Sequence, residues 1–91
     1  PVSKPYIQQR DSSAVEGLSF WMHCSLENGT EPIHYIWEHE NLSGQISILA
    51  KSNSSLINMT LLTRNHTGWF WCLARNEVNE QQSDRIWLDV L

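Results

Sequence analysis

The chain has 91 residues and a formal net charge of −4, so it is long enough for one small domain. Its acidic and basic residues are dispersed without a basic cluster, which excludes the electrostatic footprint of a nucleic-acid-binding protein. It contains neither a signal peptide nor an apolar run of roughly 18 residues, the length that a membrane span needs. We therefore expect any export signal and any membrane anchor to lie outside this segment.

The opening segment PVSKP, residues 1–5, contains two prolines and a lysine and indicates an interdomain linker. From residue 6 to residue 91, apolar and polar residues alternate in short runs that turn residues separate. No helical periodicity longer than one turn is present. The pattern predicts a single all-β domain over residues 6–91.

Successive side chains of a strand point to opposite faces, so each alternating run defines one buried face. The first clear run leaves Trp21 on the outward face of its strand. The expected inward rows, in chain order, are Leu18, Phe20, Met22, Cys24 and Leu26; Tyr35 and Trp37; Ile57, Met59 and Leu62; Phe70, Cys72 and Ala74; and Ile86, Leu88 and Val90.

Residues 42–55 are rich in Ser, Asn and Gly and have the weakest pattern of the chain. Ile46, Ile48 and Leu49 predict one short edge strand within them.

The two cysteines, Cys24 and Cys72, lack the CxxC spacing and the histidine-rich neighbourhood of a metal site. A structural bridge is the better interpretation, and disulfides persist in oxidising compartments. By restricting the unfolded chain, a bridge over this separation would stabilise the fold by ~4 kcal/mol.

Five of the seven asparagines begin an Asn-x-Ser/Thr triplet without an intervening proline, the acceptor pattern for N-glycosylation. With 15 Ser and Thr among 91 residues, chance would give about one such triplet. The set therefore indicates a secreted or cell-surface glycoprotein. The expected acceptors are Asn28, Asn41, Asn53, Asn58 and Asn65.

Motifs for catalysis or metal binding are missing from the sequence. It contains no GxSxG nucleophile elbow, and its cysteines are expected to bond to each other. The histidines are not spaced as ligand pairs with a cysteine or a carboxylate, so we expect them to be exposed or in turns. We predict no enzymatic activity, no metal and no cofactor. The four histidines are His23, His34, His39 and His66.

The spacing of three residues carries a family resemblance. Trp37 follows Cys24 by thirteen residues, and Cys72 ends a Gly-x-aromatic-x-Cys sequence. This order of cysteine, tryptophan and cysteine resembles the immunoglobulin superfamily. The segments CLARN (72–76) and LDV (88–90) look like the last strands of its short constant-like and intermediate sets.

Three longer segments narrow the resemblance to domains of the Fc-receptor-like and platelet–endothelial adhesion molecule group. They are EPIHYIWEHE (31–40), LLTRNHTGWFWC (61–72) and SDRIWLDVL (83–91). The resemblance implies a two-sheet sandwich with an intersheet disulfide between Cys24 and Cys72, packed on Trp37. It also places Phe70 and Leu88 in the core.

The chain departs from the family pattern at three positions. Phe70 occupies the site of the usual corner tyrosine, so we expect the hydrogen bond of that hydroxyl to be absent. His66 replaces an aspartate common at the same corner. Asn79 replaces a glycine in the last hairpin, and asparagine tolerates turn conformations better than most residues.

The segment GWFWC (68–72) raises the main functional question, because Phe70 and Cys72 point inward and both of its tryptophans therefore point outward. We expect a hairpin centred near Asn79 to place Trp71 opposite Trp87. A ladder that only stiffens the sheet is the alternative. A binding surface is favoured, because the face is apolar and carries no glycan acceptor on its central strands. The expected partner-binding residues are Ile36, Trp71, Leu73 and Trp87.

Three functional hypotheses follow from the resemblance and the acceptors. The first is the extracellular ligand-binding domain of a cell-surface immunoreceptor or adhesion receptor, which contacts a protein ligand or a second copy of itself. The resemblance makes this receptor most similar to inhibitory receptors of mast cells or myeloid cells, with a membrane anchor outside the segment. The second is a spacer domain of a multidomain glycoprotein. The third is a secreted soluble decoy.

Overall fold

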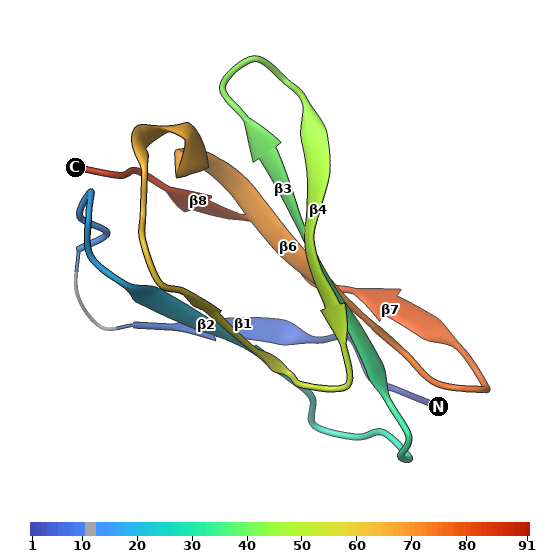
Figure 1. Cartoon of the computed structure of the whole chain (residues 1–91). Coiled ribbons are helices and arrows are strands. Elements are labelled where there is room, and N and C mark those ends of the chain that lie inside the picture. Colours follow the sequence, from blue (N-terminus) through green and yellow to red (C-terminus); the bar gives the residue numbers. More distant parts are fainter. Residues whose placement is uncertain (11–12) are drawn as a thin grey trace.

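The computed structural model describes residues 1–10 and 13–91, which form two layers of antiparallel strands (Figure 1). One layer is a three-stranded sheet, and the other is a five-stranded sheet. The three-stranded sheet has the order β1 (Tyr6–Gln9), β2 (Phe20–Ser25) and β5 (Leu56–Met59). The five-stranded sheet has the order β4 (Ile46–Ser52), β3 (His34–Asn41), β6 (Gly68–Arg75) and β7 (Glu80–Gln82), and β8 (Ile86–Leu88) also pairs with β6.

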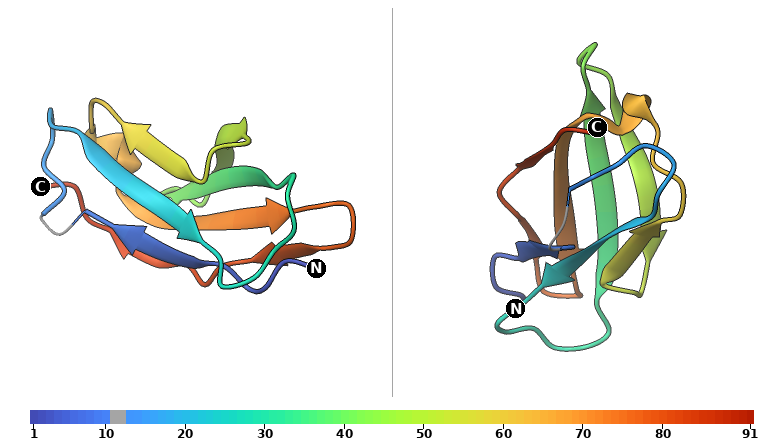
Figure 2. Two further views of the ribbon diagram at one scale, coloured as in Figure 1. Left: turned by 90° about the horizontal axis from the view of Figure 1, so that it is seen from below. Right: turned by 90° about the vertical axis from the view of Figure 1, so that its left-hand side faces the viewer.

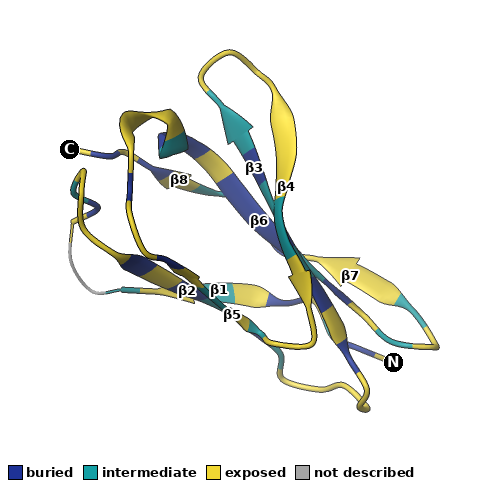
Figure 3. Cartoon of the chain, in the orientation of Figure 1, coloured by how far each residue is buried: buried dark blue, intermediate teal, exposed yellow. Residues whose placement is uncertain are grey.

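The core lies between the two sheets, where the alternating apolar residues of both layers meet (Figure 3). Cys24 on β2 and Cys72 on β6 form the predicted disulfide across it, with their Cα atoms 6.2 Å apart. Trp37, Phe70 and Leu88 are all buried there. The two-sheet fold and its disulfide are confirmed. The local alternation of the sequence directs both cysteines to the inward faces of their strands.

Two residues depart from the expected inward pattern. Leu18 is exposed because it precedes β2, in a turn where its backbone N–H donates to the Val15 carbonyl at 3.1 Å. His39, expected to be exposed or in a turn, is buried on the inward face of β3 and stacks on Phe70 at 4.4 Å between ring centroids. The phenylalanine that replaces the corner tyrosine therefore has an imidazole as its neighbour.

Residues 1–5 do not extend away from the sandwich, as a linker would. Val2 belongs to the core, and Pro5 is buried. The Val2 backbone N–H donates to Asn79 Oδ1 at 2.8 Å, and Asn79 Nδ2 donates to the Val2 carbonyl at 3.1 Å. This segment is part of the folded unit, because Val2 is buried in the core and the side chain of Asn79 satisfies both backbone polar groups of Val2.

The weak segment after residue 42 contains the expected edge strand, β4, which pairs with β3. The register shifts between Trp37 and Glu38, so β4 carries one extra residue there, and Leu49 packs against the core. The hairpin of β3 and β4 extends beyond the rest of the sandwich in Figure 1. Figure 2 shows the two layers from other sides, with the two termini at opposite ends of the molecule.

A single-turn 3₁₀ helix, η1 (Arg64–His66), leads into β6. The His66 ring supports this turn, because its Nδ1 accepts a hydrogen bond from the Thr63 backbone N–H at 2.9 Å. His66, which replaces the aspartate common in the family, thus caps the turn through a ring nitrogen.

Candidate functional site

The outward side chains of β4, β3, β6 and β8 form one continuous surface, which we call the tryptophan face. Its register is defined by pairing across the sheet: Glu40 lies between Ile46 on β4 and Trp69 on β6, and Trp69 is opposite Trp87 on β8. One row across four strands therefore reads Ile46, Glu40, Trp69 and Trp87. Three of its four side chains are apolar and exposed.

The aromatic pair on this face is Trp69 with Trp87, and the expected pair of Trp71 with Trp87 is wrong. The two rings meet edge to face, with centroids 5.1 Å apart and planes inclined by 72°. This is a favourable arrangement for two quadrupolar rings. Trp69 is 39% exposed and Trp87 is 46% exposed, so both remain accessible to a partner.

Trp71 points outward but is only 3% exposed, so it is not an accessible anchor. The guanidinium carbon of Arg85 lies 4.2 Å from the centroid of its ring, in cation–π geometry. Its indole N–H donates to Glu38 Oε1 at 3.0 Å. Arg85 also reaches Glu40, with Nη1 3.2 Å from Oε1. Two charged neighbours therefore cover the tryptophan that the sequence indicated as a binding residue.

The position of the last hairpin turn is the first reason why Trp87 pairs with Trp69 and not with Trp71. Arg75 pairs with Glu80, so the hairpin is centred between Glu77 and Val78 and not at Asn79. Asn76 sets this turn, because its Oδ1 accepts from the backbone N–H groups of Val78 and Asn79 at 2.9 and 3.1 Å.

A β-bulge in the strand after this turn is the second reason. Leu73 pairs with Gln82, and Phe70 pairs with Ile86, so two residues of β6 face the three residues 83–85 of the other strand. The extra residue turns Arg85 onto Trp71. Ser83 closes the interrupted ladder, since its Oγ accepts from the Cys72 N–H at 2.9 Å.

The other two expected contact residues, Ile36 and Leu73, pair with each other across β3 and β6. Both are half-buried and lie on the tryptophan face beside Trp71. Sequence reasoning missed Ile46 and Ile48 as contact candidates, although both are outward and more than half exposed. The signal for them was the predicted edge strand, whose pairing with β3 determines which face they share.

The five glycan acceptors lie away from the outward positions of β3, β6 and β8. Asn58 is exposed on β5 of the three-stranded sheet, Asn65 is exposed in η1, and Asn28 and Asn53 are exposed in loops. Asn41 is half-buried at the end of β3, where its Oδ1 accepts from the backbone of Ser43 at 2.9 Å. The outward positions of the central strands of the tryptophan face therefore carry no acceptor.

Charge on the tryptophan face is balanced locally, because Glu40 and Arg85 pair with each other. Beneath the face, burial lowers the pKa of His39 below its ordinary value near 6.5, since the charged form would lose its hydration. The His39 Nε2 atom is buried and has no hydrogen-bond partner among the described residues. This histidine is therefore neutral at physiological pH and acts as a core aromatic.

Within residues 1–10 and 13–91, no group of three or more His, Cys, Asp or Glu side chains could hold a metal ion. No helix in the described part of the chain is long and apolar enough to cross a membrane.

Comparison with known proteins gives one family. Residues 4–76 match the immunoglobulin domain family. The chain is 33% identical to human Fc receptor-like protein 5 over 93 aligned residues, which cover 100% of the chain and 9% of that protein. It is also 33% identical to mouse Fc receptor-like protein 1, covering 99% of the chain and 26% of that protein. The chain thus spans about a tenth of the length of human Fc receptor-like protein 5 and about a quarter of that of mouse Fc receptor-like protein 1.

Two solved structures share the fold at 22% sequence identity. The crystal structure of murine CEACAM1b superposes with a TM-score of 0.79, covering 100% of the chain and 46% of the other. The structure of mouse coronavirus receptor-binding domain complexed with its murine receptor gives a TM-score of 0.72, with the same coverage.

Proposed function

The chain belongs to the immunoglobulin domain family, and on this premise we propose that it is the extracellular ligand-binding domain of a cell-surface immunoreceptor or adhesion receptor. It binds a protein through the tryptophan face, either a surface protein or a second copy of this domain. The similarity to Fc receptor-like proteins supports the receptor class. An inhibitory role stays a prediction from the sequence resemblance.

The observation that carries this proposal is the row of Ile46, Glu40, Trp69 and Trp87, with Ile48 beside it on β4. Four exposed apolar side chains lie on one sheet face, at its end beside the projecting β3–β4 hairpin. Large rigid aromatics are the side chains that most often anchor protein interfaces, and a clustered exposed apolar patch marks a contact surface.

The absence of acceptors from the outward positions of the central strands supports the same surface. A glycan is bulky and hydrated, so a face that docks a protein must be free of one over its centre. Glu40 and Arg85 supply the polar part of the surface, between the tryptophan pair and the isoleucines. A partner would therefore present apolar groups flanked by complementary charge.

The decisive experiment replaces Trp69 and Trp87 together with serine in domain expressed with its glycans in mammalian cells. Multivalent tetramers of the domain are titrated on a panel of leukocyte lines, and self-association is followed by sedimentation. We expect affinity to fall at least tenfold, or ~1.4 kcal/mol, because interface anchors commonly contribute more than this. The fold should remain intact, since both rings are partly exposed.

The matched control is Trp21→Ser, which removes an equally exposed tryptophan from the three-stranded sheet. It should leave binding unchanged. Equal losses in the control and in the double variant would contradict a face-specific site. A folded double variant that binds normally would favour the spacer function, and wild-type tetramers that bind no cell and do not self-associate would do the same.

A further inference from the structure

Trp21 is the exposed tryptophan that the tryptophan face does not explain. It is 40% exposed on the outward side of β2, in the three-stranded sheet. Its cross-strand partner on β5 is Asn58, the acceptor of the Asn58-Met59-Thr60 triplet. We propose that Trp21 is the stacking platform for the first N-acetylglucosamine of a glycan on Asn58, and that this sugar covers the outer face of the three-stranded sheet.

The acceptor is presented for modification. Asn58 and Thr60 are exposed, while Met59 between them is buried in the core, so the strand directs both side chains of the triplet away from the interior. The Asn58 carboxamide makes no hydrogen bond to another described residue, and its nitrogen is free to carry a sugar. Asn41 differs, because its Nδ2 donates to Gln45 Oε1 at 3.3 Å.

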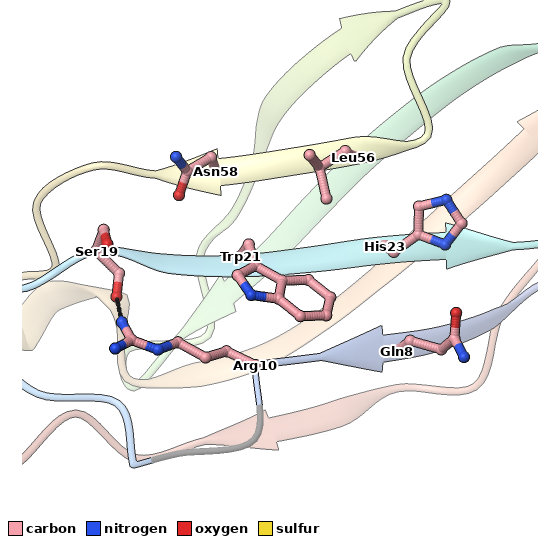
Figure 4. A pocket seen from close by; sticks show the side chains of 7 residues that line it. All are labelled: Gln8, Arg10, Ser19, Trp21, His23, Leu56 and Asn58. Carbon is pink, nitrogen blue, oxygen red and sulfur yellow. Dashed lines mark hydrogen bonds between the residues drawn. The ribbon is translucent and has the colours of Figure 1, made fainter.

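The platform lies across β2 from that nitrogen. The backbones of the paired residues Trp21 and Asn58 are separated by one interstrand spacing of ~4.8 Å, so a sugar on Asn58 has to pass over β2 to reach the indole. Figure 4 shows the indole of Trp21 lying over the sheet between Arg10 and Gln8, on the side of β2 away from Asn58. A sugar that extends from Asn58 across β2 therefore meets the indole.

The chemistry of the two surfaces is complementary. A pyranose presents axial C–H groups on one face, and these carry the partial positive charge that the negative face of an indole attracts. Arg10 lies on the same face as Trp21, where its guanidinium donates to the Ser19 carbonyl (Figure 4). Its other N–H groups can donate to sugar hydroxyl and acetamido oxygens.

The neighbouring histidine does not compete for the sugar. Both ring nitrogens of His23 are already engaged, Nδ1 with Ser25 Oγ at 2.6 Å and Nε2 with Ser55 Oγ at 2.7 Å. Leu56, two residues before Asn58 on the same face of β5, is half exposed. The surface is thus apolar at its centre and polar where Arg10 and Gln8 border it.

The test separates the sugar from the platform in a double-mutant cycle. The domain is expressed in cells that make only oligomannose glycans and is then trimmed by endoglycosidase H, which leaves one N-acetylglucosamine on each occupied asparagine. Urea unfolding is compared with and without Thr60→Ala, which removes the acceptor triplet, in the wild type and in Trp21→Thr. Unglycosylated bacterial protein corrects for the effect of each substitution alone.

With Trp21 present, we expect the single sugar to lower the unfolding equilibrium constant by about three- to tenfold, because it covers much of the exposed indole. With Trp21→Thr, the effect should be less than about twofold. Removing the loop acceptor with Asn53→Gln should change stability by the same small factor in both backgrounds. Equal stabilisation by the Asn58 sugar with and without Trp21 would overturn the proposal.

A second measurement does not depend on any variant being stable. In the trimmed wild type, the N-acetyl methyl proton signal of the Asn58 sugar should be displaced upfield by the ring current of Trp21, whereas that of the Asn53 sugar should not. An undisplaced Asn58 signal, or an unoccupied Asn58 in mass spectra of the mammalian protein, would show that Trp21 is not a glycan platform.

Discussion

Trp71 and Trp69 lie two residues apart on the same face of the same strand, yet the structure assigns them opposite roles. Trp71 is 3% exposed and Trp69 is 39% exposed. Replacing each with alanine therefore compares the contributions to stability of a tryptophan covered by Arg85 and Glu38 and of an exposed one. We expect Trp71→Ala to be destabilising and Trp69→Ala to be tolerated.

The expected magnitudes follow from burial and contacts. Deleting a buried tryptophan side chain typically costs ~3–5 kcal/mol. Trp71 should fall at the low end, ~3 kcal/mol, because Arg85 and Glu38 can return to water once the ring is gone. Trp69→Ala loses mainly its edge-to-face contact with Trp87, which contributes ~1 kcal/mol. The difference of ~2 kcal/mol is a large share of the stability of a small domain.

Equilibrium urea unfolding at pH 7 measures both values, since for a domain of this size the midpoint moves by ~1 M for each kcal/mol. Arg85→Ala provides an intermediate case: it removes the cover but keeps the ring, so it should cost ~1 kcal/mol and shift tryptophan fluorescence to the red. Equal losses for Trp71→Ala and Trp69→Ala, or a larger loss for Trp69→Ala, would refute the assignment of Trp71 as a structural residue.

Two further predictions concern the backbone and the core. Gly68→Ala should cost ~3 kcal/mol or more in urea unfolding, because φ is +149° and an added Cβ would lie 2.1 Å from the Glu40 carbonyl oxygen. Gly44→Ala, at φ +80° with nothing within 4 Å, should cost only ~1 kcal/mol, and an equal loss at both sites would show that the close contact is unimportant. His39→Phe should flatten the fall of stability that begins as the pH drops below about 6.5. The native His39 pKa is lowered, so below about pH 6.5 the unfolded chain binds more protons than the fold and stability declines. An unchanged slope in His39→Phe would contradict a neutral buried histidine.

Much of the sandwich could be predicted because the alternation of side chains along a strand is a local property. Phe20, Met22 and Cys24 share one face of β2 whatever strand lies beside them, and this parity also sends Trp21 and Asn58 outward. The pairing of two well-separated cysteines needed only the resemblance and the absence of any competing cysteine. The inward and outward positions of these strands therefore follow from the periodicity of the sequence alone.

Register and cover depend on contacts between segments distant in sequence, which periodicity does not encode. A turn centred between Glu77 and Val78, followed by one extra residue near Ser83, changes the partner of Trp87 from Trp71 to Trp69. The same bulge brings Arg85 over Trp71. Parity correctly predicted that Trp71 points outward. Whether an outward side chain meets solvent or a neighbour's guanidinium is decided by the opposing strand, and so by the tertiary structure.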